Sequence, residues 1–153
     1  MNWFYDLIRN PFLITSISSW FIAQLLKMII HAIVCKTWEL ERLFGDGGMP
    51  SGHSATVTSL AIYSALSCGT ASFQFAVCAI LAIIVCHDAM GVRWETGKQA
   101  QAINELIKSI NILAKKDVPT EKLKEFVGHT PVQVMAGVLL GAANACLMYF
   151  VIL

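Results

Sequence analysis

Three long apolar segments decide what this chain can fold into. Residues 12–34, 73–86 and 130–153 carry one charged side chain between them, and the first and last are long enough to span a membrane, which takes about 20 helical residues. The chain is 56% hydrophobic and only 14% charged, which is wrong for a soluble globule. We therefore expect one all-α integral membrane domain over residues 1–153, a bundle of about four transmembrane helices.

The fourth membrane helix is expected over residues 55–68. Serine and threonine recur along it, and small residues at this density favour packing against other helices over exposure to lipid. The last segment has Thr130 as a cap and Pro131 at the first helical position. Its Gly137 and Gly141, four residues apart, offer a face on which another helix can pack closely.

Residues 94–128 differ from the rest because charged side chains return. Apolar residues recur there at helical spacing and predict an amphipathic helix from about residue 95 to 114, lying on the membrane or against a partner. A break at residues 118–120 and a second short helix from Glu121 are expected to follow. The apolar stripe consists of Ile103, Leu106, Ile107, Ile110 and Leu113.

The distribution of basic residues predicts the orientation and the assembly. Lysine and arginine gather in the connector 36–50 and in residues 93–128, so the positive-inside rule places both in the cytoplasm and both termini on the other side. Residues 94–128 are then an inserted cytoplasmic helical segment. A bundle of about four helices encloses little polar interior. We therefore expect a homodimer or higher homo-oligomer, joined by the apolar stripe or by the Gly137/Gly141 face.

The first apolar segment carries a polar stripe. Gln24, Lys27 and His31 lie three and four residues apart and share one helix face. A charge inside a span is costly unless it faces a polar interior, so we expect this stripe to face a site. The alternative is that Lys27 and His31 reach the nearby membrane interface.

A glycine-rich turn, residues 47–54, leads into the second helix. Its glycines and proline make a tight turn, Ser51 or Ser54 can cap the helix, and the helix N-terminus offers backbone N–H groups to an anion. His53 adds a titratable proton donor at this point. An ordinary loop between two helices is the alternative interpretation.

Three polar pieces are predicted to meet at one membrane surface: this turn, residues 88–93 and residues 128–137. Two histidines, an arginine, a lysine and a backbone anion site are the parts needed to transfer a phosphoryl group through a phosphohistidine. One histidine attacks phosphorus, and the other protonates the leaving alkoxide. This chemistry requires no metal and no other cofactor; a divalent cation at Asp46 and Asp88 is the weaker alternative.

These motifs resemble the type 2 phosphatidic acid phosphatase superfamily, which includes the vanadium haloperoxidases, over nearly the whole chain. Residues 50–53 are similar to its Pro-Ser-Gly-His motif, and residues 129–131 to the stretch around its nucleophilic histidine. Arg93 ends a helix as the phosphate-binding arginine of the family does. Residues 47–49, 88–93 and 97–100 point to the divergent branch of small membrane proteins.

The resemblance implies a phosphatase for a lipid phosphate monoester or pyrophosphate. It implies His129 as nucleophile, His53 as general acid and Arg93 as phosphate ligand. The first family motif, a lysine followed seven residues later by Arg-Pro, is not met. The substrate-binding candidates are therefore Lys27 in place of that lysine, with Arg42 second, together with Ser51, Gly52 and Lys98.

The residue that orients the nucleophile departs from the family. Where the family has an acid, Gln133 can accept a hydrogen bond from the imidazole but cannot stabilise an imidazolium by charge; Asp88 or Glu125 is the alternative orienting group. A non-catalytic protein that binds phosphorylated lipid or acts as an assembly partner is therefore the alternative function, and a haloperoxidase with an incomplete set of cationic ligands is a third. A net charge of +1 and the lack of a basic-aromatic module argue against a nucleic-acid partner.

Overall fold

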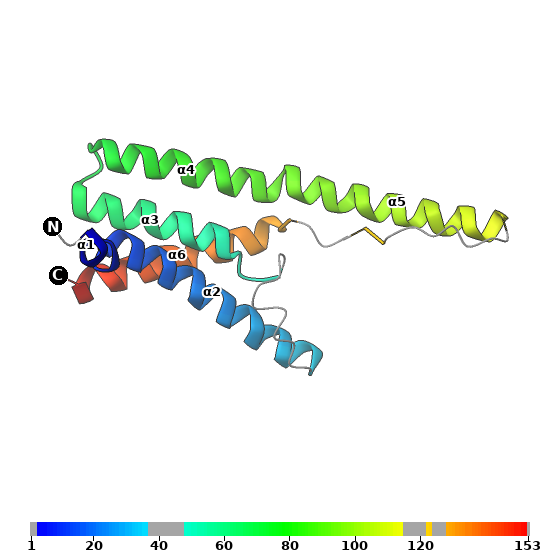
Figure 1. The fold of residues 1–153 in the computed structure, drawn as a ribbon, viewed down its shortest axis with the longest axis horizontal. Helices are drawn as coiled ribbons and strands as arrows, with labels where there is room; N and C mark the ends of the chain where they lie inside the picture. The colour runs from blue at the N-terminus through cyan, green and yellow to red at the C-terminus, as the bar shows by residue number, and fades with distance from the viewer. Residues whose placement is uncertain (1–2, 37–47, 115–121, 124–127, 153) are drawn as a thin grey trace.

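The computed structural model describes residues 3–36, 48–114, 122–123 and 128–152, and the regular structure in these residues is helical throughout (Figure 1). Segments long and apolar enough to cross a membrane occur in three places within them: in α2, in the rod made by α4 and α5, and in α6. The predicted all-α membrane bundle is confirmed. The helices are α1 (Trp3–Ile8), α2 (Pro11–Cys35), α3 (Gly52–Cys68), α4 (Phe73–Met90), α5 (Val92–Ala114) and α6 (Pro131–Ile152).

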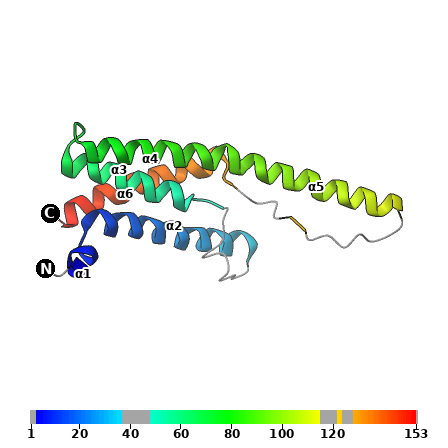
Figure 2. The same cartoon turned by 45° about the horizontal axis from the view of Figure 1, so that its top comes forward.

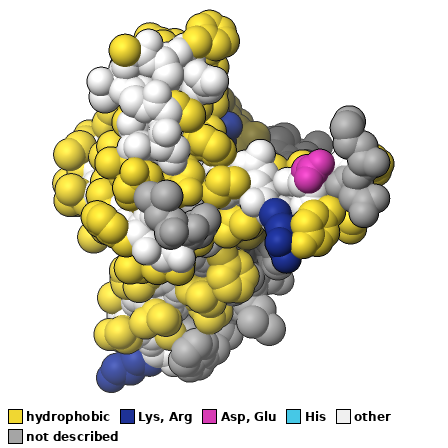
Figure 3. Space-filling view, turned by 90° about the vertical axis from the view of Figure 1, so that its left-hand side faces the viewer, with side chains coloured by type: hydrophobic (Ala, Val, Ile, Leu, Met, Phe, Trp, Pro, Cys, Tyr) yellow, Lys and Arg dark blue, Asp and Glu magenta, His cyan; other side chains and the backbone are white. Residues whose placement is uncertain are grey.

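The two ends of the bundle differ in character. Both chain termini lie at the end that carries the turn between α3 and α4, on the left of Figure 1 and again in Figure 2. Hydrophobic side chains cover most of this end, with few charged groups among them (Figure 3). The N-terminus of α3, the junction of α4 with α5 and the N-terminus of α6 lie toward the opposite end. The three polar pieces that the sequence predicts to meet thus share one end.

Capping residues set the starts of α2, α3 and α6, as expected for Thr130 and for Ser51. Pro11 is the first residue of α2, whose cap Asn10 accepts a hydrogen bond from the backbone of Phe12 at 3.0 Å. Thr130 Oγ1 accepts from the backbone of Gln133 at 3.3 Å and caps α6. Because Ser51 rather than Ser54 caps α3, that helix begins at residue 52 instead of 55, and His53 lies in its first turn.

The central helix of the bundle is α3, which packs against α2, α4 and α6. A Cβ atom at Gly137 would overlap the carbonyl oxygen of Ser51, and one at Gly141 would overlap that of Ala55, so the backbones of α3 and α6 touch. The predicted close-packing face is confirmed. Its partner is α3, however, so this face is not available for contact between copies. The buried residues of α3 are small, apart from one tyrosine: Gly52, Ser54, Ala55, Thr58, Ser59, Ala61, Tyr63 and Ser64.

A buried asparagine joins α6 to α2. Nδ2 of Asn144 lies 2.7 Å from Ser19 Oγ, 2.9 Å from Ser18 Oγ and 3.2 Å from the carbonyl oxygen of Thr15. Polar contacts of this kind hold helices together where the surroundings supply no hydrophobic driving force. Together with the glycine contact, this network fixes α6 against both α2 and α3.

Helices α4 and α5 form a nearly continuous rod, which corrects the sequence prediction. A helix ending near residue 86 and another from about residue 95 were expected, but Gly91 alone separates α4 from α5. Its N–H donates to His87 O at 2.9 Å, and Glu95 N–H donates to Gly91 O at 3.0 Å, so the helical bonding runs through the junction. As a result α5 projects beyond the bundle in line with α4 (Figures 1 and 2).

The projecting helix keeps the predicted apolar stripe. Ile103, Leu106, Ile110 and Leu113 are exposed, so association of copies through this stripe stays a prediction. The short helix expected from Glu121 falls mostly outside the described residues.

We expect Gly141→Ala to destabilise the bundle by about 1–3 kcal/mol, because the added methyl meets the Ala55 carbonyl, although alanine is the better helix former. The measurement is the thermal unfolding midpoint in detergent. Ala143→Ser, which also adds one heavy atom but on an exposed position of α6, is the control and should leave the midpoint unchanged. A Gly141→Ala protein as stable as wild type would contradict the contact.

Candidate active site

A cavity of about 230 Å³ lies where α3, α4 and α5 meet residues 128–129, and we name it the polar cavity. It brings together the three candidate catalytic residues, His53, Arg93 and His129, from separate parts of the chain. The fourth polar residue of its wall is Asp88, an orienting candidate. The apolar part of the wall consists of Ile84, Val85, Ala89 and Gly128.

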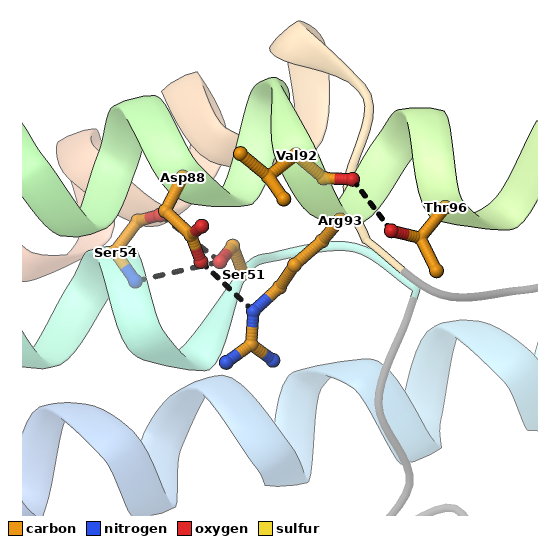
Figure 4. Close-up of polar contacts among 6 residues, drawn as sticks. All are labelled: Ser51, Ser54, Asp88, Val92, Arg93 and Thr96. Carbon is orange, nitrogen blue, oxygen red and sulfur yellow. Dashed lines mark hydrogen bonds and ion pairs between the residues drawn. The ribbon is translucent and has the colours of Figure 1, made fainter.

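The first turn of α3 places His53 at this cavity. His53 is exposed, whereas the preceding Ser51 is fully buried and its Oγ accepts hydrogen bonds from Ser54 N at 3.4 Å and from Ser54 Oγ at 3.0 Å (Figure 4). The Ser51 hydroxyl therefore caps the helix and does not line the cavity. Gly52 packs toward Trp20 and also does not line it. The N–H groups of residues 52 and 53 belong to the helix turn that has no intrahelical acceptors, which favours an anion near His53.

His129 is buried and held against α4. The backbone N–H of His129 donates to the carbonyl oxygen of Ala89 at 3.1 Å. Gly128 has a φ of +96°, and a Cβ there would overlap the backbone of Arg93 and Trp94. Only glycine lets the chain pass this close to the first turn of α5. In the sequence, the place of Gly128 directly before His129 is the signal for this role.

The side chain of Gln133 contacts the imidazole of His129. Its Oε1 accepts a hydrogen bond from Thr130 N at 3.1 Å, which identifies that atom as the amide oxygen, and it lies 3.3 Å from His129 Nδ1. Because an amide oxygen only accepts, Nδ1 of a neutral ring must carry the proton in this contact. The lone pair of the neutral ring is then on Nε2.

Asp88 and Arg93 form an ion pair across the α4–α5 junction. Arg93 Nε lies 3.0 Å from Asp88 Oδ2, and both side chains are about half exposed, at 47% and 45% (Figure 4). A pair this exposed contributes little to stability. Arginine has five N–H donors, so a guanidinium bound through Nε retains others for an anion. The contact that the structure shows for Asp88 is with Arg93, rather than with a histidine.

Two further substrate-binding candidates, Lys98 and Lys27, do not line the polar cavity. Lys98 follows Arg93 by five residues, which is about 140° around the helix, and its Nζ contacts Glu95 Oε1 at 2.8 Å. Lys27 is buried, so the polar stripe does face the interior, but it lines a separate cavity of about 180 Å³ together with His31 and Gly48. Arg42 lies outside the described residues, as do Asp46 and Glu125.

We expect Asp88→Asn to tighten the binding of orthovanadate by about tenfold, equivalent to about 1.4 kcal/mol, because it removes a negative charge from the cavity wall. Isothermal titration calorimetry in detergent measures this. Glu95→Gln makes the same change of charge on the same rod outside the cavity and should leave the affinity unchanged. Unchanged or weaker binding to Asp88→Asn would show that the anion does not bind beside Asp88.

Comparison with known proteins agrees with the resemblance read from the motifs. The chain is 40% identical over 145 residues to an uncharacterized membrane protein, YuiD, of Bacillus subtilis (strain 168), an alignment that covers 89% of this chain and 92% of the relative. No solved structure matches the chain. The model of the family described as the Divergent PAP2 family matches residues 8–144, which include every residue of the polar cavity, and the chain belongs to this family.

Proposed function

We propose that the protein is a membrane phosphatase that removes the phosphate from a phosphorylated lipid through a phosphohistidine. The observation that carries the proposal is that His53, Arg93 and His129, from three separate parts of the chain, line one cavity. Membership of the Divergent PAP2 family supports phosphatase-related chemistry. The lysine-bearing helix α5 leaves the bundle from the end that holds the cavity, so the reaction takes place at the cytoplasmic membrane surface.

In the first step the phosphoryl group moves from the lipid to His129. Nε2 attacks phosphorus in line, a P–N bond forms, and the P–O bond to the lipid breaks. His53 gives its proton to the departing oxygen, which leaves as an alcohol. The hydrogen bond from Nδ1 to Gln133 keeps the ring in the reactive tautomer, and the Arg93 guanidinium binds the equatorial oxygens.

In the second step water releases the phosphate. His53, now neutral, takes a proton from a water molecule, which attacks phosphorus and breaks the P–N bond. His53 is then protonated again and His129 is neutral, so both are ready for the next turnover. An amide stabilises the positive ring of the intermediate less than a carboxylate would, so Arg93 and the N-terminus of α3 carry more of the electrostatic stabilisation.

The alternative function is binding of phosphorylated lipid without turnover. The ion pair between Asp88 and Arg93 favours it, because the arginine that would hold the transferring phosphoryl group already has a carboxylate partner. Phosphate release distinguishes the two functions.

We expect purified protein in detergent to release inorganic phosphate from lipid phosphates in the presence of excess chelator. His129→Ala should abolish release, because the covalent step loses its nucleophile, and His53→Ala should lower kcat by about 10²- to 10⁴-fold. Gln133→Glu keeps an acceptor for Nδ1 and serves as the control that retains release.

Two results would contradict the phosphatase proposal. One is release that persists undiminished in His129→Ala. The other is orthovanadate binding that depends on His53 while no lipid phosphate is turned over, which would identify a binding protein.

A further inference from the structure

A second cavity adjoins the polar cavity and is lined by apolar surface. It has a volume of about 290 Å³ and lies between α2, α3 and α4, and we name it the apolar cavity. Two residues, His53 and Val85, line both cavities. The two spaces are therefore neighbours that share a wall. The other residues that line the apolar cavity are Ile17, Trp20, Thr56 and Val57.

The apolar cavity reaches farther along α3 than the polar cavity does. The polar cavity is lined by His53 from this helix, whereas the apolar cavity also has Val57, about one helical turn, or roughly 5 Å, farther from the N-terminus of α3. Along α4 the two cavities share Val85, and the polar cavity continues to Ile84. On α3 the apolar cavity thus extends from the polar end of the bundle toward its middle. Ile17, on the opposite wall, is 62% exposed, so the cavity borders the surface that lipid would cover.

The surface that lines the apolar cavity is apolar throughout. The Thr56 hydroxyl donates to the Gly52 carbonyl at 2.8 Å, which leaves its methyl group for the wall. Among the described residues of this wall, His53 is the one that can ionise. A ligand that enters the apolar cavity must therefore bring hydrocarbon, because a polar group there would lose its hydration without gaining a partner.

We infer that the ligand is the phosphate monoester of a long-chain alcohol, with its hydrocarbon attached directly to the ester oxygen and lying in the apolar cavity. The inference rests on the proposed function for one point, the position of the ester oxygen beside His53. Because His53 belongs to both walls, the carbon atoms that follow this oxygen enter the apolar cavity at once. A diacylglycerol phosphate would place glycerol and ester carbonyl oxygens against the same apolar surface, so it fits less well.

The test measures binding and does not require turnover. Butyl, hexyl and octyl phosphonate, which cannot be hydrolysed, compete with orthovanadate for the protein in zwitterionic lipid nanodiscs. We expect each added methylene to tighten binding by about fourfold, which corresponds to about 0.8 kcal/mol. Dioctanoyl phosphatidic acid should bind at least about tenfold more weakly than octyl phosphonate, since one unpaired carbonyl costs at least this much.

Two variants and one control distinguish binding in the apolar cavity from simple partition of the phosphonates into the nanodisc. Val57→Phe fills the apolar cavity and should flatten the dependence on chain length while orthovanadate binds as in wild type. Val77→Phe makes the same change on an exposed position of α4 and should behave as wild type. Ile17→Ala alters the cavity from its exposed wall, where the fold is not at risk, and should weaken octyl phosphonate binding without changing orthovanadate binding.

The same dependence on chain length in Val57→Phe, Ile17→Ala and wild type would overturn the inference. Phosphatidic acid binding as tightly as octyl phosphonate would also overturn it. If the phosphonates bind as expected but octyl phosphate is not hydrolysed, the phosphatase proposal fails while the assignment of the ligand stands.

Discussion

The close contact between α3 and α6 is the constraint on which the rest of the structure depends. Gly137 and Gly141 let the α6 backbone touch the carbonyl oxygens of Ser51 and Ala55, so the N-terminal ends of the two helices lie side by side. The N–H of Ser51 donates to the carbonyl oxygen of Gln133 at 3.0 Å and joins these two ends directly. The same turns carry His53 and His129, so the packing of small residues in the membrane also sets the position of the two histidines.

The rod of α4 and α5 completes the site from the other side. The N–H of His129 bonds to Ala89, and Gly128 passes against the start of α5, so the chain that returns from residues 94–127 is anchored at the α4–α5 junction. Arg93 lies about one helical turn after Ala89. A buried histidine in contact with an amide, an exposed histidine and an arginine then line one space, and the apolar cavity adjoins it.

Much of this arrangement could be predicted because it depends on local chemistry. Ser51 and Thr130 cap their helices as cap rules predict, and the spacing of Gly137 and Gly141 indicates close packing in any membrane helix. The meeting of His53, Arg93 and His129 followed from topology, since two helices separate the basic segments. Predicting these features requires only the sequence and the assumption that the helices lie in a membrane.

The features that could not be predicted depend on distances between elements. Separate helices ending near residue 86 and beginning near residue 95 are expected, but the N–H and carbonyl of Gly91 both continue the helical bonding, so Arg93 and Lys98 lie on one helix, about 140° apart around its axis. The sequence places Lys27 on an inward face, as observed, but its depth relative to α3 decides that it lines a different cavity. No pattern in the sequence indicates that Asp88 pairs with Arg93, because the contact depends on how the junction turns.

The most direct test of the account is to trap the covalent intermediate. Wild-type protein mixed with radiolabelled octyl phosphate and quenched in alkali should carry a label on His129, stable to alkali and released by acid, as a phosphoramidate is. The label should be absent from His129→Ala. Turnover without any labelled protein, or with a label that resists acid or maps to another residue, would show that the reaction does not pass through His129.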